Sequence, residues 1–258
     1  MKKIIFFDLD NTLHSTKHKK ILDETITMLK EISKKSNIEL GLATGRGENK
    51  IEMLDDLIHL FKYKVFLNGA IAYKDNKLVY NNPINKKEVI NVLNYADKNK
   101  VAVGFVGKSV EYITEYSKLE DFKFTKNNIA IPEVLNNAHE VIDVYQLWLF
   151  SKNKEKVTNI LENSTLRSYL WHTGGADLTD NNTNKAIAIK KVLEDETNYQ
   201  LIAVGDGHND LEMIDSADIG IAMGNSGFSE LKEKADYIAP HIDDNQLYTF
   251  LKSIKIFD

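Results

Sequence analysis

Cysteine is absent from all 258 residues of the chain, which excludes disulfide bonds and thiolate metal sites. A chain without cysteine suits a reducing compartment. Long apolar runs are also lacking, so no segment reaches the length of a membrane span. The short apolar run near the N-terminus ends at Asp8, too early for a signal peptide. We therefore expect a soluble cytoplasmic protein without a membrane partner.

A concentrated basic region, of the kind that binds nucleic acid, does not occur either. The 33 lysines and arginines are distributed along the chain among 38 aspartates and glutamates, and the formal net charge is -5. The composition is that of a globular chain, 43% hydrophobic and 28% charged. The length suffices for one large domain or two smaller ones. We expect no nucleic-acid partner.

In place of long apolar runs, the chain contains short ones, each followed by polar turn residues. Such runs, apolar on both faces, are typical of strands in a buried parallel sheet. Apolar residues at helical spacing separate them at 26–32 and 54–58, and a last helix over 247–254 has Asp243 or Asp244 as its expected cap. The pattern predicts an α/β fold with right-handed crossovers. The strand runs are 4–7, 40–43, 65–67, 201–204 and 219–223.

The middle of the chain has a different pattern. Helical spacing over 89–96 precedes several strand candidates, some of which follow one another without a helix between them. That order predicts an antiparallel or mixed sheet covered by helices, an α+β module inserted into the α/β domain. We expect the core at 1–79 and 181–258 and the insertion at 80–180. The strand candidates are 101–106, 111–114, 144–150 and 168–171, with a further helix over 154–162.

Two carboxylates, Asp8 and Asp10, follow the first strand run directly. Carboxylates so close repel one another, and the repulsion raises one pKa unless a cation lies between them. The pair is therefore either a solvated turn or a cation site with a chemical role.

Three further polar segments each have an ordinary explanation when taken alone. Thr44, in Ala43-Thr44-Gly45-Arg46, fits a helix cap, and Lys185 fits a solvated lysine near a helix start. Asp206 and Asp210 lie four residues apart in Gly205-Asp206-Gly207-His208-Asn209-Asp210, where glycine makes the backbone flexible.

Taken together, these segments predict one site. Three of them follow buried-strand runs, and ligands bind beyond the carboxyl ends of the strands in open α/β sheets. Four converging carboxylates require a cation, and oxygen ligands suit Mg²⁺. A lysine and a hydroxyl are suitable partners for phosphate. The set therefore indicates a site for Mg²⁺ and a phosphate group.

In this order, the segments resemble the four motifs of the haloacid dehalogenase (HAD) superfamily of phosphohydrolases. The spacing is most similar to that of the Cof-type branch, whose large cap is inserted between the second and third motifs. The stretches Leu67-Asn68-Gly69-Ala70 and Ala176-Asp177-Leu178-Thr179 also resemble that branch. The resemblance covers roughly residues 1–78 and 180–258, and the insertion matches in position, size and pattern only. It implies a Rossmann-like parallel sheet core with an inserted α+β cap domain.

The resemblance also implies a role for each motif residue. Asp8 would be the nucleophile that forms an aspartyl-phosphate, and Asp10 the general acid and then base, with its backbone carbonyl on Mg²⁺. Asp206 and Asp210 would be metal ligands, so that the metal set is Asp8, Asp10, Asp206 and Asp210. Thr44, Lys185 and Asn209 would bind phosphate oxygens.

Four residues depart from the branch pattern or flank the motifs. Asn11 stands where the branch usually has glycine, and both residues tolerate unusual backbone angles. Ala186 replaces a common glycine, which a helix start accepts. His14 and His208 flank the site and are expected to be structural or exposed rather than catalytic.

The expected activity is that of a phosphatase acting on a small phosphorylated metabolite such as a sugar phosphate, in a monomer or weak homodimer. Cap candidates for specificity are Trp171, His172 and Gly174-Gly175, although these residues fit ordinary cap positions equally well. A phosphomutase or phosphotransferase would share all four motifs. A phospho-receiver module lacks the second acid pair and the insertion, and a true dehalogenase has no need of Asp10.

Overall fold

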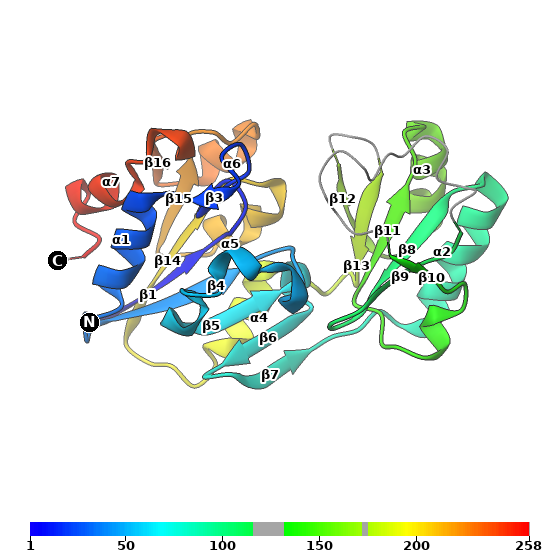
Figure 1. Cartoon of the computed structure of the whole chain (residues 1–258), viewed down its shortest axis with the longest axis horizontal. Helices are drawn as coiled ribbons and strands as arrows, with labels where there is room; N and C mark the ends of the chain where they lie inside the picture. The colour runs from blue at the N-terminus through cyan, green and yellow to red at the C-terminus, as the bar shows by residue number, and fades with distance from the viewer. Residues whose placement is uncertain (116–131, 172–174, 258) are drawn as a thin grey trace. The chain divides into compact units, whose positions relative to one another are not determined.

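The computed structural model describes residues 1–115, 132–171 and 175–257, which form two compact units (Figure 1). The first unit combines Met1–Arg46, Lys50–Asn81 and Asn184–Asp258. The second unit consists of Gly47–Asn49 and Asn82–Thr183. The first unit is thus assembled from chain segments on either side of the second.

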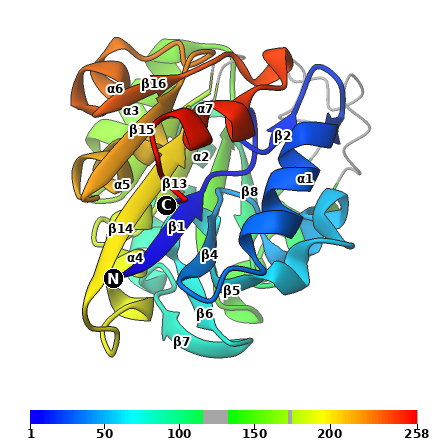
Figure 2. The same ribbon diagram turned by 90° about the vertical axis from the view of Figure 1, so that its left-hand side faces the viewer.

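An eight-stranded sheet runs through the first unit in the order β16-β15-β14-β1-β4-β5-β6-β7, with β1 near its middle (Figure 2). Neighbouring strands from β16 to β5 are parallel, and β6 and β7 are antiparallel additions. The strands are β1 (Lys2–Phe7), β4 (Ile38–Ala43), β5 (Phe61–Phe66), β6 (Ile71–Lys74), β7 (Lys77–Asn81), β14 (Tyr199–Gly205), β15 (Ile219–Met223) and β16 (Tyr237–Ala239).

Helices cover both faces of this sheet. On one face, α4 (Lys185–Val192), α5 (Leu211–Asp215) and α6 (Ser229–Lys234) bury their apolar side chains against Phe6 and Val65. On the other face lie α1 (Asp23–Ile32) and α7 (Leu247–Ser253) (Figure 2). Because both faces are covered, the central strands are largely apolar toward their carboxyl ends, and the five strand runs expected from the sequence are confirmed, except that Leu67 lies in the 3₁₀ turn Leu67–Gly69 after β5.

Two expectations for the first unit are wrong. Residues 54–58 form no α-helix, because Leu54 and Leu57 are buried by successive 3₁₀ turns such as Glu52–Leu54 and Ile58–Leu60. Neither Asp243 nor Asp244 caps the last helix, since both lie in the 3₁₀ turn Ile242–Asp244. The Asp243 carboxylate instead accepts a hydrogen bond from Ser15 Oγ at 2.7 Å, in the small hairpin of β2 (His14–Ser15) and β3 (Lys20–Ile21).

The second unit is a six-stranded sheet in the order β10-β9-β8-β11-β13-β12, with α2 (Lys86–Asn99) and α3 (Lys154–Glu162) packed together against it. All strand pairs are antiparallel except β9 with β10. The expected α+β pattern is confirmed: the four strand candidates match β8, β9, β11 and β12 to within two residues at each end, whereas β10 and β13 were not predicted. The strands are β8 (Ala102–Val106), β9 (Glu111–Ile113), β10 (Glu133–Val134), β11 (Gln146–Phe150), β12 (Arg167–Leu170) and β13 (Ala176–Thr179).

None of the helices in the described residues could cross a membrane. The longest α-helix among them, α2, has 14 residues, whereas a bilayer span needs about 20 apolar residues.

Candidate active site

Three adjacent parallel strands of the first unit end in polar residues at one edge of the sheet. Asp8 follows β1, Thr44 follows β4, and Asp206 follows β14. The strand order β14-β1-β4 makes these ends neighbours, and the Asp8 backbone N–H donates to Val204 O at 2.9 Å. The sheet itself therefore brings together three segments far apart in the chain.

Three carboxylates form a tight cluster at this edge. Oxygens of Asp8, Asp206 and Asp210 all lie within 4.8 Å of one another. Asp8 and Asp210 are buried, and Asp206 is half-buried. The fourth predicted metal residue, Asp10, does not belong to this cluster of side chains. The arrangement supplies hard oxygen donors of the kind that bind a divalent cation such as Mg²⁺.

Lys185 enters the cluster from the first position of α4. Its Nζ lies 2.6 Å from Asp8 Oδ1 and 2.6 Å from Asp210 Oδ1, and the residue is 1% exposed. The side chain of Asn184 caps the helix by accepting from Ile187 N at 2.7 Å. A cation at a helix N-terminus is ordinarily unfavourable, and here the two carboxylates compensate for it. The solvated-lysine explanation is thus wrong.

The charges of the cluster are incompletely balanced without a cation. Burial raises the pKa of Asp8 well above its ordinary value; Lys185 opposes that shift, and the charges of Asp210 and Asp206 add to it. Burial, together with the charge of Asp210, raises the pKa of Asp206 to about 7. Burial lowers the pKa of Lys185, but Asp210 and Asp8 outweigh it and raise that pKa above the usual value. One lysine cannot neutralise three carboxylates, so the donor set fits a bound cation.

Asp210 also fixes the loop that carries Asp206. Its Oδ2 accepts hydrogen bonds from the backbone N–H groups of Asp206 (3.0 Å) and Gly207 (2.9 Å). Gly205 is required beside it, because a Cβ there would lie 2.5 Å from the Asp210 carboxyl carbon. The four-residue spacing of the two acids thus serves loop geometry as well as charge.

The Asp10 carboxylate is held by Arg46. Nε of Arg46 lies 2.7 Å from Oδ2 and Nη2 lies 2.8 Å from Oδ1, while His14 Nδ1 is 3.4 Å from Oδ1. Burial alone would raise the pKa of Asp10, but the hydrogen bonds and charges of Arg46 and His14 lower it to about 2. The sequence assigned no role to Arg46, although it directly follows the Thr44-Gly45 motif. Asn11, next to Asp10, has the left-handed φ of +58° expected of a glycine substitute.

Thr44 is buried and does not cap an α-helix. Its Oγ1 accepts from Arg46 N at 3.1 Å, a local side-chain turn that leads into the 3₁₀ turn Glu48–Lys50. The motif therefore aims a hydroxyl at the same sheet edge as the carboxylates.

Two asparagines outside the predicted set join the site segments. Asn68 accepts from Asn209 Nδ2 at 2.8 Å through its Oδ1. Asn225 donates to Asn11 O at 2.9 Å and to Asp206 Oδ2 at 3.4 Å. Asn68 follows β5 and Asn225 follows β15, and both are core strands. A polar residue just after an apolar strand run is the sequence signal that could have identified them.

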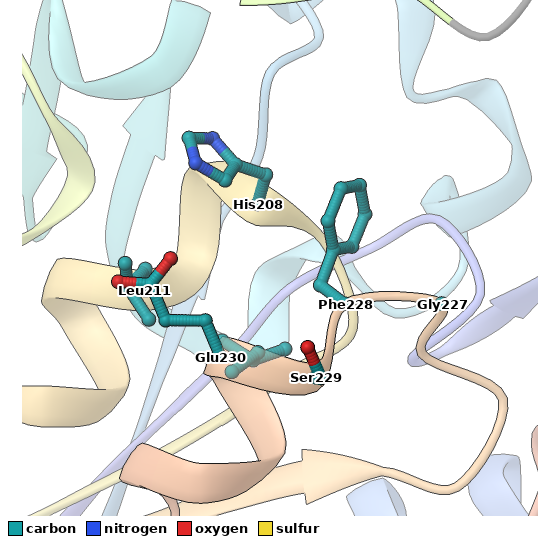
Figure 3. A pocket seen from close by; sticks show the side chains of 7 residues that line it. His208, Leu211, Gly227, Phe228, Ser229 and Glu230 are labelled. Carbon is teal, nitrogen blue, oxygen red and sulfur yellow. The ribbon is translucent and has the colours of Figure 1, made fainter.

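His208 is exposed, as expected of a flanking residue, and its ring centroid lies 5.7 Å from that of Phe228. It lines a surface hollow at the start of α6 (Figure 3). No residue of the carboxylate cluster lines that hollow. The lining residues are His208, Leu211, Gly227, Phe228, Ser229, Glu230 and Leu231.

Among the specificity candidates of the second unit, Trp171 hydrogen-bonds the carboxyl group of Asp177. Burial raises the pKa of Asp177 to about 7, although Trp171 and Gln146 oppose that shift. Gly175 has a φ of +94°. His172 and Gly174 lie outside the described residues.

Comparison with known proteins identifies the class that this fold and site define. Residues 5–251 match the family model of the haloacid dehalogenase-like hydrolases. The chain therefore belongs to that family and is a hydrolase of the HAD superfamily, as its motifs indicated.

Curated relatives of similar sequence carry phosphatase names. A candidate phosphatase of Bacillus subtilis, YkrA, is 29% identical over 98% of this chain and 97% of its own length. The phosphatase YwpJ of the same organism is 26% identical over 98% of this chain and 99% of its own. A candidate bifunctional phosphatase/peptidyl-prolyl cis-trans isomerase of Streptococcus pyogenes is 29% identical, and this chain spans 54% of its length.

Solved structures confirm the fold. The HAD subclass IIB sugar phosphatase BT4131 superposes with a TM-score of 0.87 at 25% identity, covering 99% of this chain and 100% of that one. BT1666 of Bacteroides thetaiotaomicron superposes with a TM-score of 0.89 at 23% identity, covering 100% and 96%. The expected α/β class with a parallel sheet core is therefore correct.

Proposed function

We propose that the protein is a Mg²⁺-dependent phosphatase that hydrolyses small phosphorylated metabolites through an aspartyl-phosphate intermediate. The observation that carries this proposal is the cluster of Asp8, Asp206 and Asp210 at the carboxyl edge of the sheet, in which Lys185 pairs with the buried Asp8 and Asp210. Membership of the hydrolase family and the names of the relatives support it.

Asp8, Asp206 and Asp210 would hold the metal through side-chain oxygens, with the backbone carbonyl of Asp10 as a further ligand. Mg²⁺ would supply positive charge that balances the carboxylates and the phosphate oxygens. Lys185, Thr44 and Asn209 would hold the oxygens of the phosphoryl group. The Asn209 amide nitrogen has two hydrogens, of which one goes to Asn68, and we assign the other to phosphate.

In the first half-reaction, a carboxylate oxygen of Asp8 attacks phosphorus and the bond from phosphorus to the leaving-group oxygen breaks. Asp10 gives its proton to the departing alkoxide. Since Arg46 holds Asp10 as a carboxylate, Asp10 must leave this ion pair and take up a proton from solvent before the first step. Lys185 reduces the repulsion between Asp8 and the anionic phosphate.

In the second half-reaction, water attacks phosphorus and the bond from phosphorus to Asp8 breaks. Asp10 takes the proton from this water, so that inorganic phosphate leaves and both aspartates return to their starting forms. The pairing of Asp10 with Arg46 suits this step, because it favours the carboxylate form of the base.

The substrate we infer is a sugar phosphate or a similar small metabolite. The support is the sugar phosphatase among the matched structures, together with the second unit, which we assign as the inserted cap that selects the leaving group. We place the protein in the cytoplasm as a monomer or weak homodimer without a nucleic-acid partner.

A screen of the purified protein against phosphorylated metabolites, with Mg²⁺, tests this function. We expect release of inorganic phosphate from at least one sugar phosphate. Transfer of the phosphoryl group to a second sugar, without free phosphate, would instead favour the phosphomutase or phosphotransferase that shares these motifs.

A further inference from the structure

The turn that follows β5 has an unusual backbone. Leu67, Asn68 and Gly69 have consecutive positive φ values of 52°, 55° and 102°. Asparagine and glycine tolerate this region, but leucine rarely adopts it. Such conformations persist where the surrounding structure holds them, and they cluster at functional sites. Apart from the hydrogen bond that Asn68 accepts from Asn209, the mechanism above gives this turn no role, and its contacts indicate that it has one.

The side chain of Asn68 reaches the loop that carries the second acid pair. Its Oδ1 accepts from Asn209 Nδ2 at 2.8 Å, and Asn68 is only 1% exposed. Asn209 lies one residue before Asp210, and its Oδ1 is so close to Gly207 that a Cβ there would lie 2.4 Å away. The Asn209 amide thus lies between the Asn68 side chain, which hydrogen-bonds it, and the bare backbone of Gly207.

The backbone of Asn68 reaches the threonine motif. Its N–H donates to Thr44 O at 3.1 Å. Gly45 packs so closely that a Cβ at that position would lie 3.0 Å from Asn68 Oδ1. One residue therefore contacts both segments that carry Thr44 and Asn209.

Gly69 extends the same turn to the lysine motif. A Cβ on Gly69 would lie 2.2 Å from the carbonyl oxygen of Asn184, the residue that caps α4 immediately before Lys185. The turn therefore contacts all three segments that carry the proposed phosphate-binding residues.

We propose that Asn68 is a positioning residue for phosphate, which aims the Asn209 amide through its side chain and braces Thr44 through its backbone. This inference rests on the proposed function, in which Thr44, Lys185 and Asn209 hold the phosphoryl oxygens. Asn68 acts through Asn209, so replacing Asn68 weakens phosphate binding without removing a reacting group.

The test variant is Asn68→Gly, which removes the amide and leaves a residue that adopts the left-handed backbone without strain. Asn198→Gly is the matched control, because Asn198 has a φ of 54° in an exposed turn whose residues have no part in the site. The measurement is calorimetric titration of each protein with inorganic phosphate in the presence of Mg²⁺. Steady-state kinetics with a phosphate ester follow for comparison.

We expect Asn68→Gly to weaken phosphate binding by about 3- to 10-fold, the change that corresponds to the net contribution of one hydrogen bond. Asn198→Gly should bind phosphate like the wild type. In a double-mutant cycle, Asn68→Gly should add little to the effect of Asn209→Ala, because the first residue acts through the second. The value of KM should rise more than kcat falls.

Unchanged phosphate affinity in a folded Asn68→Gly variant would overturn the inference. Effects of Asn68→Gly and Asn209→Ala that simply multiply in the double variant would overturn it as well. A wild type that binds phosphate but hydrolyses no ester would refute the proposed function while the binding results still decide the role of Asn68. A wild type that binds no phosphate would refute both.

Discussion

Arg46 grips both carboxylate oxygens of Asp10 in a bidentate pair, at 2.7 and 2.8 Å, while its Nη1 donates to Lys50 O at 2.9 Å. Such a forked pair is among the stronger hydrogen-bonded ion pairs in proteins. The pair with Arg46 distinguishes Asp10 from the other carboxylates of the site. Three lie close together, two of them paired with Lys185, and the fourth, Asp10, is paired with Arg46 outside that cluster.

The first prediction concerns this pair. In Arg46→Gln the pKa of Asp10 should rise from about 2, because burial, which raises it, is no longer opposed by the guanidinium. The proposed acid role needs the protonated form, so activity is lost as pH rises through that pKa. The falling limb of the kcat/KM profile for an alkyl phosphate should therefore move to higher pH.

Arg46→Lys serves as the matched control for this profile, because it keeps the charge and loses the fork. We expect the falling limb of the Arg46→Lys profile to lie at a pH between the limbs of the wild type and Arg46→Gln. Identical profiles for all three proteins would show that Arg46 does not set the ionisation of Asp10.

The second prediction concerns Lys185. Its replacement by methionine leaves the buried carboxylates of Asp8 and Asp210 without their cation. Removing one partner of a buried ion pair costs about 3–5 kcal/mol, so the free energy of unfolding without metal should fall by that order. Added Mg²⁺ should restore part of the loss, because the cation would neutralise the same carboxylates.

Urea unfolding of Lys185→Met, with and without Mg²⁺, measures both effects. Lys190→Met changes an exposed lysine of the same helix and should leave the unfolding free energy nearly unchanged. A Lys185→Met protein as stable as this control would contradict the account of the cluster.

The third prediction concerns Glu196, which lies in the first unit away from the proposed site residues. Lys2 and Lys74 each lie 2.8 Å from its carboxylate, and the Tyr63 hydroxyl donates to it at 2.8 Å. The hydrogen bonds from the two lysines hold the pKa of Glu196 far below its usual value. A carboxylate whose pKa is lowered on folding stabilises the protein above the unfolded-state pKa, and this stabilisation is lost as pH falls below it.

Wild type and Glu196→Gln should therefore differ most in unfolding free energy near neutral pH, and the difference should shrink as pH falls below the ordinary glutamate value of 4.5. Glu194→Gln is the control, since the Glu194 side chain is 71% exposed and its nearest lysine is 3.9 Å away. A pH-independent difference between wild type and Glu196→Gln would contradict this explanation.

Much of the fold could be predicted from the sequence, because the parallel sheet is buried on both faces. Its parallel strands contain short apolar runs, and each run that ends in an acid or threonine marks the sheet edge where ligands bind. The positions of Asp8, Thr44 and Asp206 follow from this rule.

The remaining features depend on tertiary contacts. Leu54 and Leu57 have helical spacing, yet the 3₁₀ turns bury these two side chains as well as an α-helix would. Arg46 differs from any surface arginine only in the side-chain conformation that brings it to Asp10. Asn68 and Asn225 could be noticed as polar residues after core strands, but their partners Asn209 and Asn11 lie more than a hundred residues away, and a single sequence does not show which residues pair.

The central claim is that Asp8 attacks phosphorus within a cation-dependent site. The most direct test compares phosphate release from an active metabolite by the wild type and by Asp8→Asn, a near-isosteric change, with Mg²⁺ and then with EDTA. The account predicts turnover by the wild type that EDTA abolishes and Mg²⁺ restores, and no turnover above background by a folded Asp8→Asn. Near-normal turnover by Asp8→Asn, or wild-type turnover indifferent to EDTA, would contradict it.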